Sequence, residues 1–244
     1  MVDFYEPEKL VPAIAIAALA GVIRGITGFG GAMVMSPPLA LLLGPLIAVP
    51  VVLLLESFAS TPMLFETRRL VRWRVIAPIL AMAMVTLPLG AYILTHVDAL
   101  TMRRVIAAVV VLFSLLLLRG WRYAGAQRVP TSLGLGALAG GMVGATSMGG
   151  PPVILYLLAG PDPIEVTRAN LTFFVAAISL AAVAVLALGG VLTAAGLWLA
   201  LVLAPGYYIG MVAGTRLFSK FNDRRFRQFT LLLMLAVSAG ILVA

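Results

Sequence analysis

Two charged residues lie inside long apolar stretches of the sequence and are the first candidates for chemistry. Arg24 falls within residues 10–27, and Glu56 falls midway along residues 46–65. A charge in hydrocarbon costs at least ~2.5 kcal/mol, so it normally has a partner or a function. Arg24 can bind an anion through its guanidinium group, and Glu56 can carry a proton that couples transport. Alternatively, the two residues neutralise each other as a structural ion pair.

Two glycine-rich interruptions are the second candidate feature. Gly28-Phe29-Gly30-Gly31 divides residues 10–44, and Ser147-Met148-Gly149-Gly150-Pro151-Pro152 divides residues 131–160. Glycine permits left-handed turns and leaves the backbone open to a ligand, and proline suits the first turn of a helix. A helix that begins at each interruption presents free amides and a positive dipole end to an anion. In the alternative interpretation, these glycines only allow helices to pack closely.

We therefore predict one anion site built from both interruptions, with hydroxyl donors from Thr27, Thr146 and Ser147. Asn170 either lines the same cavity or hydrogen-bonds between helices. The predicted substrate-binding residues are Arg24, Thr27, Gly28, Phe29, Gly30, Gly31, Thr146, Ser147, Met148, Gly149, Gly150 and Asn170, and the predicted coupling residue is Glu56.

The composition indicates which elements position these residues. Of the 244 residues, 62% are hydrophobic and only 11% are charged, which is too little charge to cover the surface of a soluble domain. A membrane-spanning helix needs roughly 20 apolar residues. Such runs occur at residues 46–65, 75–94, 102–118, 169–188, 191–213 and 226–244. We therefore predict an all-α integral membrane protein.

The two interrupted stretches align with each other along the chain. Five residues of the first recur in the second at a constant offset of 119, and two later pairs follow at offsets of 120 and 121. The aligned pairs are Gly25 and Gly144, Thr27 and Thr146, Gly30 and Gly149, Gly31 and Gly150, Val34 and Val153, Gly90 and Gly210, and Arg104 and Arg225. This predicts a duplication, with an N-terminal repeat at 1–125 and a C-terminal repeat at 126–244.

The basic residues distinguish two topologies. If each interrupted stretch crossed the membrane once, each face would carry eight basic residues. If each stretch is a hairpin that returns to the face it entered, one face carries 13 and the other three. The 13 lie in the loops at 66–74, 119–130, 161–168 and 214–227. The positive-inside rule favours the hairpins, which gives two inverted repeats, each a broken-helix hairpin plus three transmembrane helices, about eight membrane segments, with both termini periplasmic.

Other classes of function are disfavoured by the residues present. The chain has no cysteine and a single histidine, His96, so we expect no metal site, no cofactor and no catalytic triad. The net charge of +8 is concentrated in short loops, which indicates topology rather than nucleic-acid binding. The acidic start of the chain, with Asp3, Glu6 and Glu8, is unlike a signal peptide.

The motif Arg24-Gly-Ile-Thr-Gly-Phe-Gly-Gly and the motif Gly-Ala-Thr-Ser-Met-Gly-Gly-Pro-Pro at 144–152 resemble the TauE/SafE (sulfite exporter) family of bacterial membrane proteins. The resemblance covers the whole chain. It implies a transporter of small anions in the bacterial inner membrane, such as sulfite, sulfonates or related organosulfur and carboxylate compounds. Family members differ in substrate.

We therefore expect a secondary transporter that is not an enzyme, with proton coupling through Glu56. A passive anion channel is the alternative, since it shares every feature except coupling. An intramembrane enzyme is a remote alternative, because Ser147 has only His96 as a histidine partner, and His96 is predicted at the outer face. The expected partners are the small anionic substrate and the lipid bilayer, and a homodimer remains open.

Overall fold

The computed structural model describes residues 7–28, 30–121, 123–125, 127–218, 231–232, 235–236 and 238–242. Within these residues, the ordered elements are all α-helices, in agreement with the predicted fold class. They are α1 (Pro7–Thr27), α2 (Gly31–Leu43), α3 (Pro45–Thr67), α4 (Trp73–His96), α5 (Ala99–Leu118), α6 (Val129–Thr146), α7 (Gly150–Leu157), α8 (Ile164–Leu188) and α9 (Ala194–Phe218).

Five of the described helices are long and apolar enough to cross a membrane. Four of them, α4, α5, α8 and α9, coincide with predicted spans, and the fifth is α1, which the sequence assigned to a hairpin arm. The span predicted at 46–65 lies within α3, a helix of 23 residues. The span predicted at 226–244 falls largely outside the described residues, and the residues described within it are helical.

Both predicted interruptions are breaks between helices. The first separates α1 from α2 at residues 28–30, and the second separates α6 from α7 at residues 147–149. The helices that follow are short, with 13 residues in α2 and 8 in α7. At 1.5 Å per residue they extend about 20 Å and about 12 Å, less than the ~30 Å hydrocarbon core. Neither α2 nor α7 is therefore long enough to cross the membrane alone.

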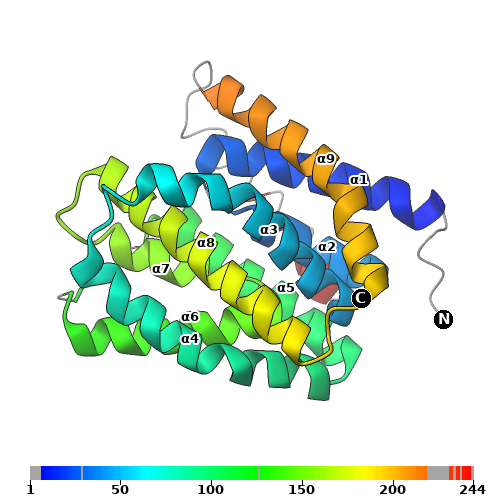
Figure 1. Ribbon diagram of the computed structural model, residues 1–244, viewed down its shortest axis with the longest axis horizontal. Coiled ribbons are helices and arrows are strands. Elements are labelled where there is room, and N and C mark those ends of the chain that lie inside the picture. The colour runs from blue at the N-terminus through cyan, green and yellow to red at the C-terminus, as the bar shows by residue number, and fades with distance from the viewer. Residues whose placement is uncertain are drawn as a thin grey trace.

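The helix connections gather at two opposite ends of the bundle (Figure 1). At one end, the Arg72 backbone N–H donates to Asn170 Oδ1 at 2.8 Å, and the Arg72 side chain forms an ion pair with Asp162 at 2.6 Å. These contacts join the α3–α4 connection to the α7–α8 region. The α5–α6 connection reaches the same end, because the Tyr123 N–H donates to the carbonyl of Leu155 in α7 at 3.3 Å.

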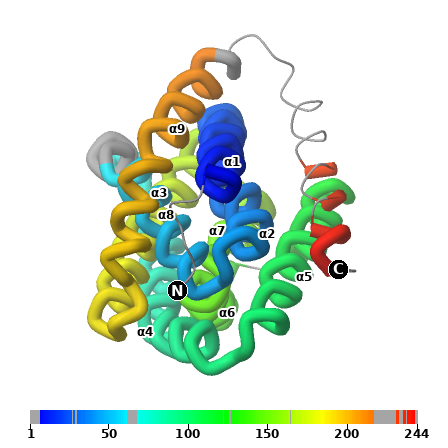
Figure 2. Tube along the Cα trace, turned by 90° about the vertical axis from the view of Figure 1, so that its right-hand side faces the viewer, coloured from blue at the N-terminus to red at the C-terminus, as the bar shows by residue number. Residues whose placement is uncertain are grey.

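The α4–α5 and α8–α9 connections lie at the opposite end, on the right of Figure 1. The end of α2 is there as well, since Arg103 Nε near the start of α5 donates to the Ala40 carbonyl at 3.0 Å. α1 runs from this end toward the other, and α2 returns to it (Figures 1 and 2). The segment from α1 to α2 is thus folded back on itself.

Two helix pairs are held together by glycines that let the backbones touch. α1 packs against α9, and α4 packs against α6, with α3 and α8 between the two pairs (Figures 1 and 2). A Cβ on Gly25 would lie 2.2 Å from the Met211 carbonyl of α9, and one on Gly144 would lie 2.4 Å from the Leu87 carbonyl of α4. Both glycines belong to the predicted repeat, and at these two positions glycine allows the helix backbones to pack in contact.

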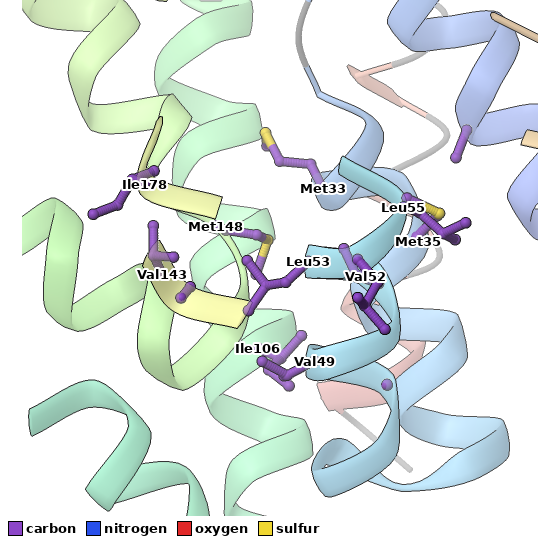
Figure 3. Packing of buried hydrophobic residues seen from close by; sticks show 14 of the residues in the cluster. Met33, Met35, Val49, Val52, Leu53, Leu55, Ile106, Val143, Met148 and Ile178 are labelled. Atoms are coloured by element: carbon purple, nitrogen blue, oxygen red, sulfur yellow. The ribbon is translucent and has the colours of Figure 1, made fainter. Parts of the chain in front are cut away.

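A buried apolar cluster fills the space between the first hairpin and the second break (Figure 3). α2 and α3 contribute one side of it, and α6, α8 and the second break contribute the facing side (Figure 3). Its labelled members are Met33, Met35, Val49, Val52, Leu53, Leu55, Ile106, Val143, Met148 and Ile178. This packing fixes the positions of the two breaks relative to each other.

Candidate functional site

A small cavity lies where the two breaks meet. Its volume is about 30 Å³, which is room for a water molecule or two. Residues from both breaks line it, together with one positive and one negative side chain. The lining consists of Arg24, Gly30, Ala32, Met33, Glu56, Val143, Ser147, Met148, Gly149, Gly150, Pro151, Val175, Ile178 and Ser179.

Arg24 and Glu56 form a buried ion pair on one wall of this cavity. Arg24 Nη1 donates to Glu56 Oε2, and Arg24 Nη2 donates to Ser60 Oγ. The hydroxyl of Tyr207 in α9 donates to Glu56 Oε1 at 2.8 Å. Arg24 is 3% exposed and Glu56 is 2% exposed. The ion pair considered from the sequence is therefore present, and both carboxylate oxygens have a donor.

Gly31 allows this cluster to rest on the start of α2. A Cβ at Gly31 would lie 2.5 Å from Glu56 Oε1 and 2.5 Å from the Tyr207 hydroxyl. Non-bonded Cβ atoms essentially never approach other atoms so closely, so a larger residue at position 31 would have to displace the Glu56 carboxylate and the Tyr207 hydroxyl. Glycine at this position thus allows the close approach of Glu56 to the start of α2.

The backbone at the first break is shaped by left-handed residues. Gly28 has φ 77° and Gly30 has φ 90°, a region that glycine adopts without steric cost. Gly30 is the N-cap of α2 and makes no side-chain capping hydrogen bond, and the first turn of α2 contains no acidic residue. The amides at the start of α2 therefore depend on groups from elsewhere in the chain.

The second break has a similar shape with a different residue. Ser147 has φ 62° and is the one non-glycine with positive φ among the described residues. Its hydroxyl lies 2.6 Å from the hydroxyl of Ser36 in α2 and forms a hydrogen bond with it. Gly149 is the N-cap of α7, again without a side-chain cap. Both breaks thus contribute uncapped helix starts near one cavity.

The structure brings together most of the predicted site residues. Arg24, Gly30, Ser147, Met148, Gly149, Gly150 and the predicted coupling residue Glu56 line the cavity. Gly31 lies against Glu56, and Gly28 lies next to the guanidinium of Arg168, whose Nη2 would be 3.1 Å from a Cβ. Thr27 ends α1, its side chain is not among the described parts, and Phe29 lies outside the described residues.

Two predicted residues lie apart from the cavity lining. Thr146 Oγ1 donates to the Met142 carbonyl of its own helix at 2.7 Å. Asn170 is at the end of the bundle, where Oδ1 accepts from the Arg72 backbone. Of the two roles considered for Asn170, the structure shows a hydrogen bond between segments.

Sequence reasoning missed several polar residues at the site. Ser60 lies four residues after Glu56, so helical periodicity could have identified it. Ser36, Ser179 and Tyr207 lie singly in apolar stretches and carry no such signal. Tyr207 is brought to Glu56 only by the packing of α9 against α1 and α3.

Within the described part of the chain, no cluster of three or more His, Asp or Glu side chains is arranged to hold a metal ion. His96 is the last residue of α4, where it is exposed and stacks on Tyr92.

These features define a polytopic helical membrane protein with a small charged cavity between two helix breaks. The family model described as Sulfite exporter TauE/SafE matches residues 13–241, nearly the whole chain. The chain therefore belongs to the TauE/SafE sulfite exporter family, as its motifs indicated. This is a family of membrane transporters rather than enzymes. No curated protein and no solved structure matches the chain with significance.

Proposed function

We propose that this protein is a secondary transporter that moves a small anion, such as sulfite or a sulfonate, through the cavity between the two breaks. The observation that carries the proposal is the position of Arg24, a buried cation that lines one cavity together with residues at the starts of α2 and α7. A guanidinium group and helix N-termini both favour negative charge. Family membership supports an anionic cargo.

The proposed architecture is a pair of inverted repeats, residues 1–125 and 126–244, with about eight membrane segments. Three features support it. Gly28 and Ser147 are 119 residues apart and share a left-handed conformation. The α1–α9 and α4–α6 pairs each join the first arm of one hairpin to the second of the three transmembrane helices that follow the other hairpin. In addition, α3 and α8, which follow the hairpins, pack against each other.

The proposed orientation places both termini in the periplasm of a bacterium and the protein in its inner membrane. Basic loops at 66–74 and 119–130 reach one end of the bundle together with the α7–α8 connection. The positive-inside rule assigns that end to the cytoplasm.

The small volume of the cavity supports a mechanism of alternating access. An open channel would leave a continuous path, whereas a space of about 30 Å³ admits an anion only after the breaks move apart. Each break is followed by a short helix, and such broken helices are suited to that movement. We propose that protonation of Glu56 is coupled to it.

Transport by the purified full chain in proteoliposomes tests the function. Sulfite uptake is expected to saturate, to accumulate against its gradient when a proton gradient is imposed, and to be lost in Arg24→Gln. Ser114→Ala on α5 is the matched control, because this buried residue has no role in the cavity. Flux that neither saturates nor responds to the proton gradient would identify a passive channel instead.

A further inference from the structure

The carboxylate of Glu56 lies where an anion bound at this site would lie. Oε2 accepts from Arg24, the buried cation of the cavity lining, and Oε1 accepts from Tyr207 at 2.8 Å. Oε1 also rests against the start of α2, 2.5 Å from where a Cβ of Gly31 would be. Arginine and phenol are groups that bind an oxyanion, and Glu56 accepts hydrogen bonds from both while it lies against the first residue of α2.

Glu56 supplies the negative charge that its surroundings lack. α2 has neither a side-chain cap nor an acidic residue in its first turn, so the positive end of its dipole is not compensated within the helix. Glu56 comes from the next helix, α3, and is 2% exposed. The groups that face it are Arg24 from α1, Tyr207 from α9 and the backbone of α2.

A substrate anion and an ionised Glu56 cannot occupy this place together. The cavity of about 30 Å³ leaves no space for a second oxyanion head beside the carboxylate. Arg24 is the positively charged residue of the lining, so two anions would leave one negative charge without compensation. An uncompensated charge at low dielectric costs several kcal/mol.

We infer that Glu56 is a resident anion of the transport site, which a substrate with a singly charged oxyanion head displaces when Glu56 takes up a proton. The inference rests on the proposed function and specifies the substrate class and the coupling. A hydronium ion from the solvent transfers its proton to one Glu56 oxygen and leaves as water, so that one O–H bond breaks and one forms. The neutral Glu56 side chain leaves Arg24, the substrate head takes its place, and one proton enters with each anion.

The charge balance of the site selects the substrate class. Before exchange, Arg24 and Glu56 sum to zero, and after exchange, Arg24 and a monoanion again sum to zero. Relative to this exchange, a dianion such as sulfate would add one negative charge in the same space. Sulfonates and hydrogen sulfite therefore fit this site, and sulfate does not.

Binding of methanesulfonate to the purified full chain, measured by calorimetry at several pH values, tests this inference. Methanesulfonate stays a monoanion over the range used. Where Glu56 is ionised in the ligand-free protein, uptake of one proton weakens the affinity by about tenfold per pH unit of rise. In Glu56→Gln, the affinity is expected to be independent of pH and at least tenfold tighter at the alkaline end. Sulfate is expected not to compete in either protein.

Glu56→Asp guards against loss of folding in Glu56→Gln. The shorter carboxylate cannot reach Arg24 and Tyr207 at once, so it should bind methanesulfonate more tightly than wild type and keep the pH slope. The inference is overturned if wild-type affinity does not change with pH, or if Glu56→Asp binds more weakly than wild type. It is equally overturned if sulfate competes as well as methanesulfonate.

Arg24→Gln separates failure of this inference from failure of the proposed function. Suppose that Arg24→Gln abolishes binding of methanesulfonate, and that the affinity of the wild type does not change with pH. The anion site then stands, and the resident role of Glu56 is wrong. If Arg24→Gln binds methanesulfonate like wild type, the site itself has been placed wrongly, and both proposals fall.

Discussion

The hydroxyl oxygens of Ser36 and Ser147 lie 2.6 Å apart, in a hydrogen bond between α2 and the break that separates α6 from α7. The two residues are separated by 111 positions in the chain and are both buried. Ser147 holds this position through a left-handed backbone conformation, with φ 62°. The bond is thus a direct polar link between the two hairpins beside the cavity.

Ser36→Ala is expected to lower the free energy of unfolding by about 1 kcal/mol, since a neutral hydrogen bond contributes roughly 0.5–1.5 kcal/mol. The loss stays small because Ser147 Oγ also donates to the Thr146 carbonyl and keeps a partner. A reversible denaturation curve in detergent measures the difference. Ser114→Ala is the control, because its buried hydroxyl has no hydrogen-bond partner and its removal should cost nothing. Equal losses in the two variants would contradict a role for the Ser36–Ser147 bond.

A double-mutant cycle of Arg24 and Glu56 is expected to show strong coupling. Removing one member of a buried ion pair leaves the other charge uncompensated and costs about 3–5 kcal/mol. Arg24→Gln and Glu56→Gln should each destabilise the protein by this amount, and the double variant should be less destabilised than the sum of the two. Thermal unfolding of the three variants checks this. Additive losses would mean that the two side chains do not interact in the folded protein.

Helix positions and the two breaks could be predicted from the sequence because they depend on local properties. Apolar length predicts α4, α5, α8 and α9, and paired glycines predict where α1 and α6 end. The partners of Glu56 could not be predicted in this way. Tyr207 is 151 residues away and reaches Glu56 only because α9 packs against α1 through close backbone contacts.

The partner of Asn170 could likewise not be predicted from the sequence. A polar residue in an apolar helix indicates a buried partner, but not which one. The structure pairs Asn170 with the backbone of Arg72, which has an Asp162 ion pair beside it. The position of Asn170 along α8 decides which residue it meets, and the packing of α8 against its neighbours sets that position.

Asn170→Ala is therefore expected to affect stability and not substrate affinity. The variant leaves the Arg72 N–H without its acceptor, which costs about 1–3 kcal/mol when the donor is buried and less when water replaces the acceptor. Methanesulfonate affinity, measured in parallel, should stay within twofold of wild type because Asn170 is not part of the cavity lining. A loss of methanesulfonate affinity with unchanged stability would instead indicate that Asn170 belongs to the substrate site.

Neighbouring glycines of α6 are expected to differ sharply in their tolerance of alanine. A Cβ at Gly140 would lie 2.0 Å from the Ala83 carbonyl of α4, whereas a Cβ at Gly141 meets nothing within 4 Å. Gly140→Ala should separate α4 from α6 and cost about 1–3 kcal/mol, as overpacking does. Gly141→Ala should be neutral or stabilise the helix by up to about 1 kcal/mol. Melting temperatures of the two variants test the packing, and similar values would show that α4 and α6 are not in backbone contact.

The topology can be tested by cysteine labelling, because the chain contains no cysteine of its own. Leu70 and Leu100 are each 52% exposed. Leu70 lies in the α3–α4 connection and Leu100 in the first turn of α5, at opposite ends of the bundle. With a membrane-impermeant maleimide on intact cells, Leu100→Cys should be labelled, and Leu70→Cys should be labelled only after permeabilisation.

The reason is that the connection at Leu70 belongs to the end that carries the basic loops, which the positive-inside rule assigns to the cytoplasm. Leu100 comes just after the α4–α5 connection, and α4 is long enough to cross the membrane once. Trp121, 48% exposed and in the α5–α6 connection, serves as a second cytoplasmic position. Labelling of all three positions in intact cells, or of none, would rule out the inverted hairpins, because the helices α4 and α5 must then fail to cross.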